Sequence, residues 1–187
     1  MKRIVILASG SGSNAENIIV HFKGKPSVEV SAVLTNKKTA KVLDRCERLG
    51  VPALYFNKKA FMGSDTVVRL LKSLAPDLIV LAGFLWKVPS EIINAFPDQI
   101  INIHPALLPK YGGKGMYGSH VHQAVKDNLE TETGITIHYV NEHYDEGTTI
   151  FQAKTPVEPS DDADTIAKKV HQLEYEHFPK VIEKLLA

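Results

Sequence analysis

The chain has a single cysteine, Cys46, among its 187 residues. One cysteine cannot form an intramolecular disulfide, and it cannot supply a metal site built from several thiolates. The sequence therefore excludes a disulfide-stabilised secreted scaffold and a multi-cysteine metal centre. A reducing, cytosolic compartment is compatible with this composition.

The sequence also lacks a surplus of one charge and a long apolar run. Its 22 basic side chains are balanced by 21 acidic ones, which gives a net charge of +1. Without a dense Lys/Arg run, this balance argues against nucleic acid as an obligate partner. No stretch approaches the roughly 20 apolar residues that a membrane-spanning helix requires. We therefore expect a cytoplasmic protein with no membrane segment, in which the short apolar run Ile4–Ala8 is the first strand and not a secretory signal.

Strand-like apolar runs alternate with helical patterns through the first part of the chain. Such alternation is typical of βα units and of a parallel, doubly wound sheet. The run Leu78–Leu81 has no polar alternation, which favours a strand covered by helices on both faces. The predicted strands are Arg3–Ala8, Val28–Thr35, Ala53–Phe56 and Leu78–Ala82, and the predicted helices are Asn14–Phe22, Ala40–Leu49 and Ser64–Leu74.

The pattern changes after residue 102. A glycine-rich loop precedes a short helix, and two strand candidates, Gly134–Val140 and Thr149–Val157, are joined by a turn too short for a crossover helix. A long amphipathic helix follows from Asp161, and Pro179 is expected to bend or break it. These patterns predict an α/β fold: a Rossmann-like, doubly wound, mostly parallel sheet with an antiparallel carboxyl-terminal strand pair and a long final helix, in one domain spanning residues 1–187.

An amide and an imidazole, Asn102 and His104, stand two residues apart where a predicted strand ends before Pro105. Alternation puts both side chains on one side of the backbone, at the strand end where open α/β sheets bind ligands. An amide can donate a hydrogen bond to an oxyanion, and an imidazole gives or takes a proton near neutral pH. The pair suits chemistry on a carbonyl group, while the spacing alone also fits two structural residues.

Asp145 lies in a turn that leads into the last predicted strand. In a doubly wound sheet this turn can face the end of the Asn102 strand. A carboxylate near His104 is expected to raise the pKa of the imidazole and to hold its orientation. The alternative is that Asp145 only forms the turn before Gly147.

The turn Ser9–Asn14 follows the first strand and opens the first helix. Backbone N–H groups and the helix dipole favour an anion such as phosphate at this position. The turn lacks the third glycine of the dinucleotide fingerprint and the Gly-Lys-Ser/Thr of a P-loop. The alternative is a tight turn in which Ser13 or Asn14 caps the helix.

Four histidine and glutamate positions have simpler explanations. No cysteine or His-Glu-x-x-His pattern accompanies His120 and His122, so we expect them to pack the preceding loop and to bind no metal. His171 and Glu174 share one face of the final helix, where they either reach a polar ligand or belong to a solvated surface.

Four segments together resemble the folate-dependent phosphoribosylglycinamide formyltransferases of purine (IMP) biosynthesis, and the resemblance runs essentially end to end. The resemblance implies transfer of the formyl group of 10-formyltetrahydrofolate, a co-substrate, to the amine of glycinamide ribonucleotide through a tetrahedral intermediate. It implies no metal, and either a monomer or a homodimer. The segments are Gly12–Asn14, Leu81–Phe84, Asn102–Tyr111 and Asp145–Gly147.

The resemblance also implies a role for each site residue. Asn102 would hydrogen-bond the oxyanion, His104 would donate a proton or stabilise the oxyanion, and Asp145 would support the imidazolium. The implied ribonucleotide-binding residues, with the phosphate in the amino-terminal part, are Gly12, Ser13, Asn14, His171 and Glu174. The implied folate-binding residues are Leu85, Trp86, Lys87, Val88, Asn102, Asn141, Glu142, His143, Tyr144 and Asp145.

The chain departs from the family pattern at three places. Trp86 stands where some members have Arg, and the segment Phe61–Ser64 lacks an Arg that contacts folate in some members. His171 stands where Gln is common. Contacts to the folate glutamate tail are therefore the part of the resemblance with the least support in this sequence.

Rival functions divide into two classes. Methionyl-tRNA formyltransferase, sugar-nucleotide formyltransferases and formyltetrahydrofolate deformylase share the Asn102, His104 and Asp145 pattern, but they carry additional domains that the length of 187 residues does not favour. A nucleotide-binding sensor without catalysis would explain the Ser9–Asn14 turn and leave the other three residues unexplained.

Overall fold

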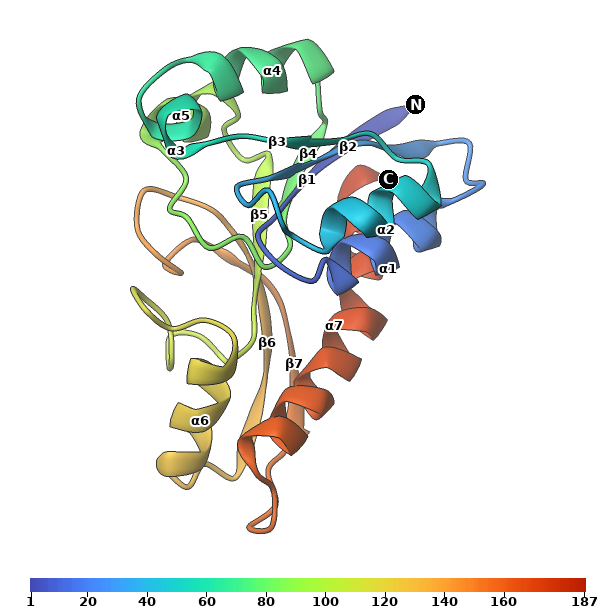
Figure 1. The fold of residues 1–187 in the computed structure, drawn as a ribbon. Coiled ribbons are helices and arrows are strands. Elements are labelled where there is room, and N and C mark those ends of the chain that lie inside the picture. The colour runs from blue at the N-terminus through green and yellow to red at the C-terminus, as the bar shows by residue number, and fades with distance from the viewer. The chain divides into compact units, whose positions relative to one another are not determined.

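The computed structural model describes residues 1–187, which form seven strands and seven helices (Figure 1). The strands make one seven-stranded sheet in the order β3-β2-β1-β4-β5-β6-β7. The strands are β1 (Lys2–Ala8), β2 (Val28–Thr35), β3 (Ala53–Tyr55), β4 (Leu78–Leu81), β5 (Ile100–His104), β6 (Glu132–Tyr139) and β7 (Thr149–Pro156). The helices are α1 (Ser13–Phe22), α2 (Val42–Leu49), α3 (Lys58–Met62), α4 (Thr66–Leu74), α5 (Ser90–Ala95), α6 (Ser119–Asp127) and α7 (Ala163–Leu186).

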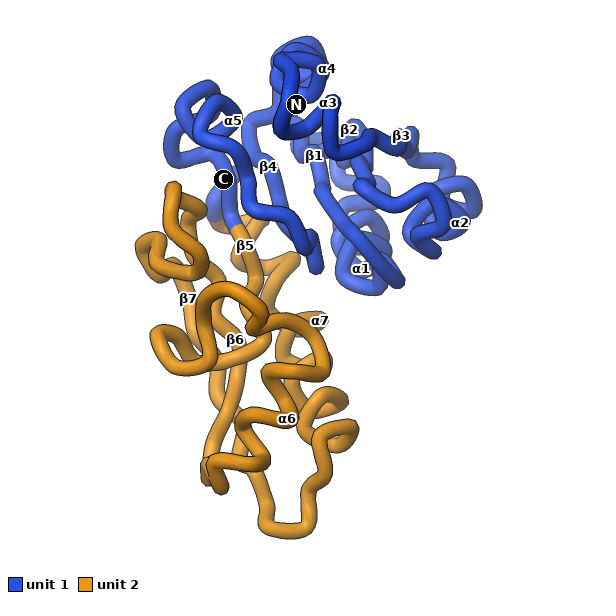
Figure 2. Tube along the Cα trace, turned by 60° about the vertical axis from the view of Figure 1, so that its left-hand side comes forward, with its two compact units in different colours: residues 1–101, 185–187 blue, residues 102–184 orange.

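The chain divides into two compact units, coloured blue and orange in Figure 2. Unit 1 contains residues 1–101 and 185–187, and unit 2 contains residues 102–184. The boundary falls inside β5, directly before Asn102. The single domain expected from the sequence stays a prediction.

Unit 1 contains the parallel βα part of the fold. β1 pairs in parallel with both β2 and β4, and β2 pairs with β3. Helices α1 and α2 lie on one side of these strands, and α3, α4 and α5 lie on the other (Figure 1). The β4 residues Leu78–Leu81 are all buried, as the absence of polar alternation predicts. The predicted doubly wound, mostly parallel α/β fold is confirmed.

Unit 2 contains the antiparallel pair β6 and β7, as predicted, and most of α7. α7 runs through Pro179 as one helix, so the expected break does not occur. A proline inside a helix costs about 3 kcal/mol. Phe178 and Ile182 on either side are fully buried, and each such side chain contributes about 1.5–3 kcal/mol, which offsets the loss.

Two short helices, α3 and α5, have no counterpart in the sequence prediction. They contain five and six residues, which is too few for a 3.6-residue apolar period to show. Asn57 caps α3 by accepting a hydrogen bond from the backbone N–H of Ala60 at 2.9 Å.

Cys46 is buried and unpaired. No helix in the structure is long and apolar enough to cross a membrane.

Candidate active site

Two of the segments predicted to bind ligands converge in unit 1. They follow β1 and β4, adjacent parallel strands whose carboxyl ends form the topological switch point of the sheet, where this fold class binds ligands. The backbone N–H of Ser9 donates to the carbonyl of Gly83 at 3.0 Å, and the N–H of Leu85 donates to the Ser9 hydroxyl at 2.9 Å. These bonds join the start of the turn that leads to Gly12–Asn14 with the start of the Leu85–Val88 segment, at the carboxyl ends of two central strands.

Gly12 is the N-cap of α1, and no side chain caps the helix. The alternative in which Ser13 or Asn14 caps the helix is therefore wrong. The backbone of Gly12 is left-handed, with φ +72°, and a Cβ at this position would collide with Val42 of α2. Only glycine fits both conditions without strain. The first turn of α1 thus presents its backbone N–H groups without a side-chain acceptor from the cap.

Two arginines of α2 lie beside this turn, a feature that the sequence prediction missed. Arg45 donates through Nε to the carbonyl of Ser11 at 2.7 Å, and it also pairs with Glu16 in the first turn of α1. Arg48 pairs with the same carboxylate. Hydrogen bonds from Arg48 and Arg45 hold the pKa of Glu16 below its usual value. The arginines thus neutralise the acidic residue nearest the predicted phosphate site.

The Leu85–Val88 segment is anchored by aromatic packing. Trp86 lies 5.8 Å from Phe61, 6.1 Å from Phe56 and 6.4 Å from Phe84, measured between ring centroids. Val88 is buried, whereas Leu85 is 39% exposed. The Trp86 indole is therefore part of an apolar cluster, and the segment presents Leu85 outward.

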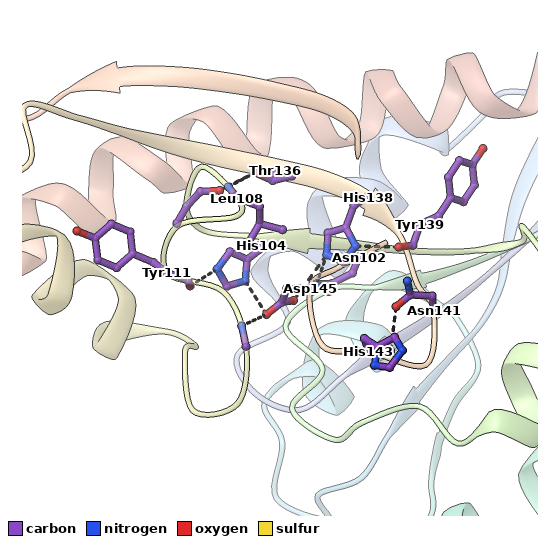
Figure 3. A network of polar contacts seen from close by, with 12 residues as sticks. Asn102, His104, Leu108, Tyr111, Thr136, His138, Tyr139, Asn141, His143 and Asp145 are labelled. Atoms are coloured by element: carbon purple, nitrogen blue, oxygen red, sulfur yellow. Dashed lines mark hydrogen bonds and ion pairs between the residues drawn. The ribbon is translucent and has the colours of Figure 1, made fainter. Parts of the chain in front are cut away.

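In unit 2, the structure brings His104 and Asp145 together, although they come from β5 and from the turn before β7 (Figure 3). Asp145 Oδ2 lies 3.7 Å from His104 Nδ1, and its Oδ1 lies 3.6 Å from Nε2 of a second histidine, His138. His104 and His138 are almost completely buried. One carboxylate thus lies between two imidazoles.

Backbone groups of the loop that follows β5 complete this arrangement. His104 Nε2–H donates to the carbonyl of Tyr111 at 2.7 Å, so Nδ1 is the nitrogen that faces Asp145. The N–H of Gly113 donates to Asp145 Oδ2 at 2.9 Å. The loop therefore fixes the tautomer of the neutral imidazole and the position of the carboxylate.

Asn102 lies on the same strand and joins the cluster through His138. The Asn102 Nδ2 lies 3.2 Å from His138 Nε2, and His138 Nδ1 lies 2.8 Å from the Tyr139 carbonyl. Because the Tyr139 carbonyl only accepts, His138 Nδ1 carries the hydrogen of that bond, and its Nε2 lies between the Asn102 amide and Asp145 Oδ1. The sequence prediction missed His138, which lies one strand away and in no local motif with His104.

Burial outweighs the effect of Asp145 on His104. Desolvation lowers the pKa of the imidazole, and the attraction of Asp145 and the bond to Tyr111 raise it by less, so the pKa lies below its usual 6.5. Asp145 therefore raises the pKa of His104 as predicted, but burial, which the prediction did not include, makes the net shift a decrease. Burial alone would raise the pKa of Asp145, but His138, His104 and the Gly113 N–H hold it below its usual value. Asp145 is therefore ionised at neutral pH.

The remaining predicted residues of unit 2 lie in two places. On α7, His171 Nδ1 lies 2.7 Å from Glu174 Oε2, and this contact raises the pKa of His171. Glu174 is 4% exposed, and near it lies His122, whose buried Nδ1 has no hydrogen-bond partner. In the exposed loop before Asp145, which contains Asn141, Glu142, His143 and Tyr144, Asn141 Oδ1 accepts the His143 N–H at 2.9 Å. No group of three or more metal-binding side chains occurs in the structure.

Known proteins resemble this chain over nearly its whole length. The family model described as formyl transferase matches residues 2–182. A protein of Haemophilus influenzae named phosphoribosylglycinamide formyltransferase is 36% identical, over 98% of this chain and 86% of its own length. Chloroplastic proteins of the same name from Arabidopsis thaliana and Vigna unguiculata are each 37% identical, and the chain spans 64% and 61% of their lengths.

Solved structures agree with this assignment. The phosphoribosylglycinamide formyltransferase of Bacillus halodurans superposes with a TM-score of 0.89 at 35% identity, covering 100% of this chain and 96% of that chain. Glycinamide ribonucleotide transformylase 1 of Geobacillus kaustophilus gives a TM-score of 0.90 at 33% identity and covers both chains completely. The resemblance predicted from the four sequence segments is thus confirmed, and the chain belongs to the formyl transferase family.

Proposed function

We propose that this protein transfers the formyl group of 10-formyltetrahydrofolate to the amine of glycinamide ribonucleotide, a step of purine biosynthesis. The observation that carries the proposal is the buried contact of His104 with Asp145, with Asn102 on the same strand. The amide and the imidazole are suited to a carbonyl carbon that becomes tetrahedral. The names of the relatives supply the acceptor and the formyl group, and the folate donor is the one that the resemblance of the four sequence segments implies.

In the proposed reaction, the amine nitrogen forms a bond to the formyl carbon, and the carbonyl oxygen becomes an oxyanion. Asn102 donates an amide N–H to this oxyanion, a type of contact worth about 3–4 kcal/mol of transition-state stabilisation. When the carbonyl re-forms, the bond between the formyl carbon and N10 of the folate breaks. The amine loses one proton and N10 gains one, so the step balances without an acyl-enzyme.

His104 carries the proton between the two nitrogens. Because its Nε2 already bears a hydrogen bonded to Tyr111, Nδ1 is the atom that takes up the proton. Asp145 then stabilises the imidazolium from 3.7 Å. A pKa below 6.5 leaves the ring neutral at pH 7 and ready to accept.

Ligand binding divides among the segments. The uncapped first turn of α1 at Gly12–Asn14, with Arg45 beside it, binds the ribonucleotide phosphate, and His171 with Glu174 binds the rest of that substrate. The segments Leu85–Val88 and Asn141–Asp145 bind folate. We also propose a cytoplasmic location.

The test incubates purified protein with 10-formyltetrahydrofolate, with and without glycinamide ribonucleotide, and follows the absorbance of released tetrahydrofolate. Release that depends on the ribonucleotide, together with formylated product in mass spectrometry, is the expected result. Equal release with water as the only acceptor would indicate a deformylase. No release in either reaction would contradict the enzyme assignment.

A further inference from the structure

The segment that follows His104 is held in place by two side chains of the β6–β7 pair. Thr136 of β6 and Gln152 of β7 are opposite one another in the register. Thr136 Oγ1 donates to the carbonyl of Ala106 at 2.7 Å and accepts the N–H of Leu108 at 3.0 Å. Gln152 Nε2 donates to the carbonyl of Leu108 at 3.1 Å and to Thr136 Oγ1 at 2.9 Å.

These bonds use every donor and acceptor of the Thr136 hydroxyl and both N–H groups of the Gln152 amide. A threonine hydroxyl has one hydrogen and two acceptor lone pairs, and all three are engaged here. Both hydrogens of the Gln152 amide are engaged as well. Thr136 is completely buried, so an unsatisfied hydroxyl would be costly. The backbone of Leu108 is thus held on both its N–H and its carbonyl side without belonging to a strand.

One side of this segment borders a cavity. Leu107, Leu108 and Pro109 border a cavity of about 280 Å³, which Tyr111 and Gln152 also line. A segment beside open volume has fewer contacts to fix it than one in a close-packed core. The hydrogen bonds from Thr136 and Gln152 therefore restrain the part of the segment that borders this cavity.

The restrained segment leads directly to the groups that touch the proposed catalytic pair. Three residues after Leu108, the Tyr111 carbonyl accepts the His104 Nε2–H, and the Gly113 N–H follows on Asp145 (Figure 3). Displacement of Leu108 would move both backbone groups relative to the imidazole and the carboxylate. Neither Thr136 nor Gln152 forms a hydrogen bond with the His104 or Asp145 side chain.

We propose that Thr136 and Gln152 are positioning residues for formyl transfer, which orient His104 and Asp145 through the Ala106–Gly113 segment. The proposal rests on the proposed function. It assigns Gln152, an exposed side chain outside the predicted site, a role in the rate of the chemical step. Substrate binding is expected to change little, because neither side chain lies in a segment proposed to bind a substrate.

The first experiment compares Gln152→Leu with the control Lys154→Leu. Lys154 lies two residues further along the same face of β7 and borders the same cavity, but its side chain pairs with Glu132 and donates no hydrogen bond to the Ala106–Gly113 segment. We expect Gln152→Leu to lower kcat roughly tenfold with both KM values within about twofold, since small displacements of a reacting group are costly. Lys154→Leu should change neither constant. Equal kcat values for the two variants would overturn the proposal.

Two Thr136 variants test whether the hydroxyl group itself is needed, since valine removes it and serine keeps it. Thr136→Val removes the hydroxyl at constant shape and should lower kcat at least as much as Gln152→Leu, while Thr136→Ser should stay within about threefold of the wild type. Because both residues act through one segment, adding Gln152→Leu to Thr136→Val should lower kcat little further. Multiplicative losses would count against a shared route. If Thr136→Val does not fold, Thr136→Ser and Gln152→Leu decide the question.

A readout independent of turnover separates this proposal from the proposed function. The buried His104 Nε2–H should give a slowly exchanging signal in an imidazole ¹H–¹⁵N spectrum of the wild type and of Lys154→Leu. Gln152→Leu should broaden or shift that signal. An unchanged signal contradicts the positioning role, whereas a wild type without turnover but with the expected spectral change contradicts only the proposed reaction.

Discussion

The Asp145 carboxylate approaches His104 from the Nδ1 side, because the Nε2–H of that ring is already bonded to the Tyr111 carbonyl. The ring is therefore poised to gain a proton on the side where a negative charge would stabilise it. This relationship joins a strand end to a turn 41 positions further along the chain.

Asp145→Asn should keep the fold and remove the charge. Without the carboxylate, the pKa of His104 should fall further below its usual value, because burial is then opposed by less attraction. We expect kcat to drop by roughly 10²-fold, as for loss of an acid–base group. NMR titration of the His104 ring and the pH profile of kcat measure the two effects. An unchanged His104 titration would show that the 3.7 Å contact does not exist in solution.

Acidification should destabilise the protein through two buried histidines. Burial lowers the folded-state pKa of His104 and of His122, so their contribution to stability is fully present above pH 6.5 and is lost as pH falls through the folded-state values. The raised pKa of His171 acts in the opposite direction, giving stability below pH 6.5 that is lost as pH rises. Urea unfolding at pH 7.5 and 5.5 should therefore show a net loss in acid.

A pair of variants isolates the His122 contribution to that pH dependence. His122→Leu should reduce the difference in unfolding free energy between the two pH values. His120→Leu, at an exposed position on the same helix, should leave the difference unchanged. Identical pH dependence in the two variants would mean that His122 is not buried as described.

Gly12→Ala should weaken ribonucleotide binding much more than folate binding. The substitution places a Cβ against Val42 and forces a residue with φ +72°. Gly24→Ala is the matched control, because Gly24 has φ +80° but open space for a Cβ. Left-handed backbone costs about 1–2 kcal/mol, so both variants should lose that stability, and only Gly12→Ala should raise the ribonucleotide Kd in calorimetry. Equal weakening of both ligands would contradict the phosphate assignment.

Trp86 is the only tryptophan, so its fluorescence reports on the Leu85–Val88 segment. Reduced folate should change the emission, and ribonucleotide alone should not. Because no arginine stands at position 86 or in Phe61–Ser64, mono- and triglutamate folates should bind with Kd values within about threefold. Trp86→Arg should shift preference toward the longer tail. A strong preference in the wild type would reveal a cation elsewhere in the site.

Local patterns predict most of this fold because its strands and longer helices are each marked by their own residues. The uninterrupted run Leu78–Leu81 identifies a buried strand, and the short turn before Thr149 identifies an antiparallel pair. The sequence does not predict α3 and α5, because a helix of five or six residues is too short to show the apolar repeat of an amphipathic helix. The predicted break at Pro179 does not occur, because burial of the side chains on either side stabilises the helix by more than the proline destabilises it.

The candidate site is less accessible to prediction where it depends on contacts between distant segments. Asn102 and His104 are visible as a spaced pair, but His138 and Arg45 reach the site regions from neighbouring elements and belong to no motif. The sign of the His104 pKa shift depends on two opposing effects: burial of the ring lowers the pKa, and the nearby Asp145 carboxylate raises it. That balance is a property of the packed structure, and residue order does not contain it.

Asp145 has a left-handed backbone, with φ +56°. Among the twenty amino acids, glycine, asparagine and aspartate adopt this conformation at the least cost, and only aspartate of these three carries a charge. The backbone conformation favours three amino acids at position 145, and the need for a negative charge selects one of them. Aspartate alone meets both requirements. In a library that varies this position, selection for growth should recover aspartate. Among the unselected variants, asparagine and glycine should give folded but inactive proteins, whereas glutamate should keep the charge and lose stability in the left-handed backbone.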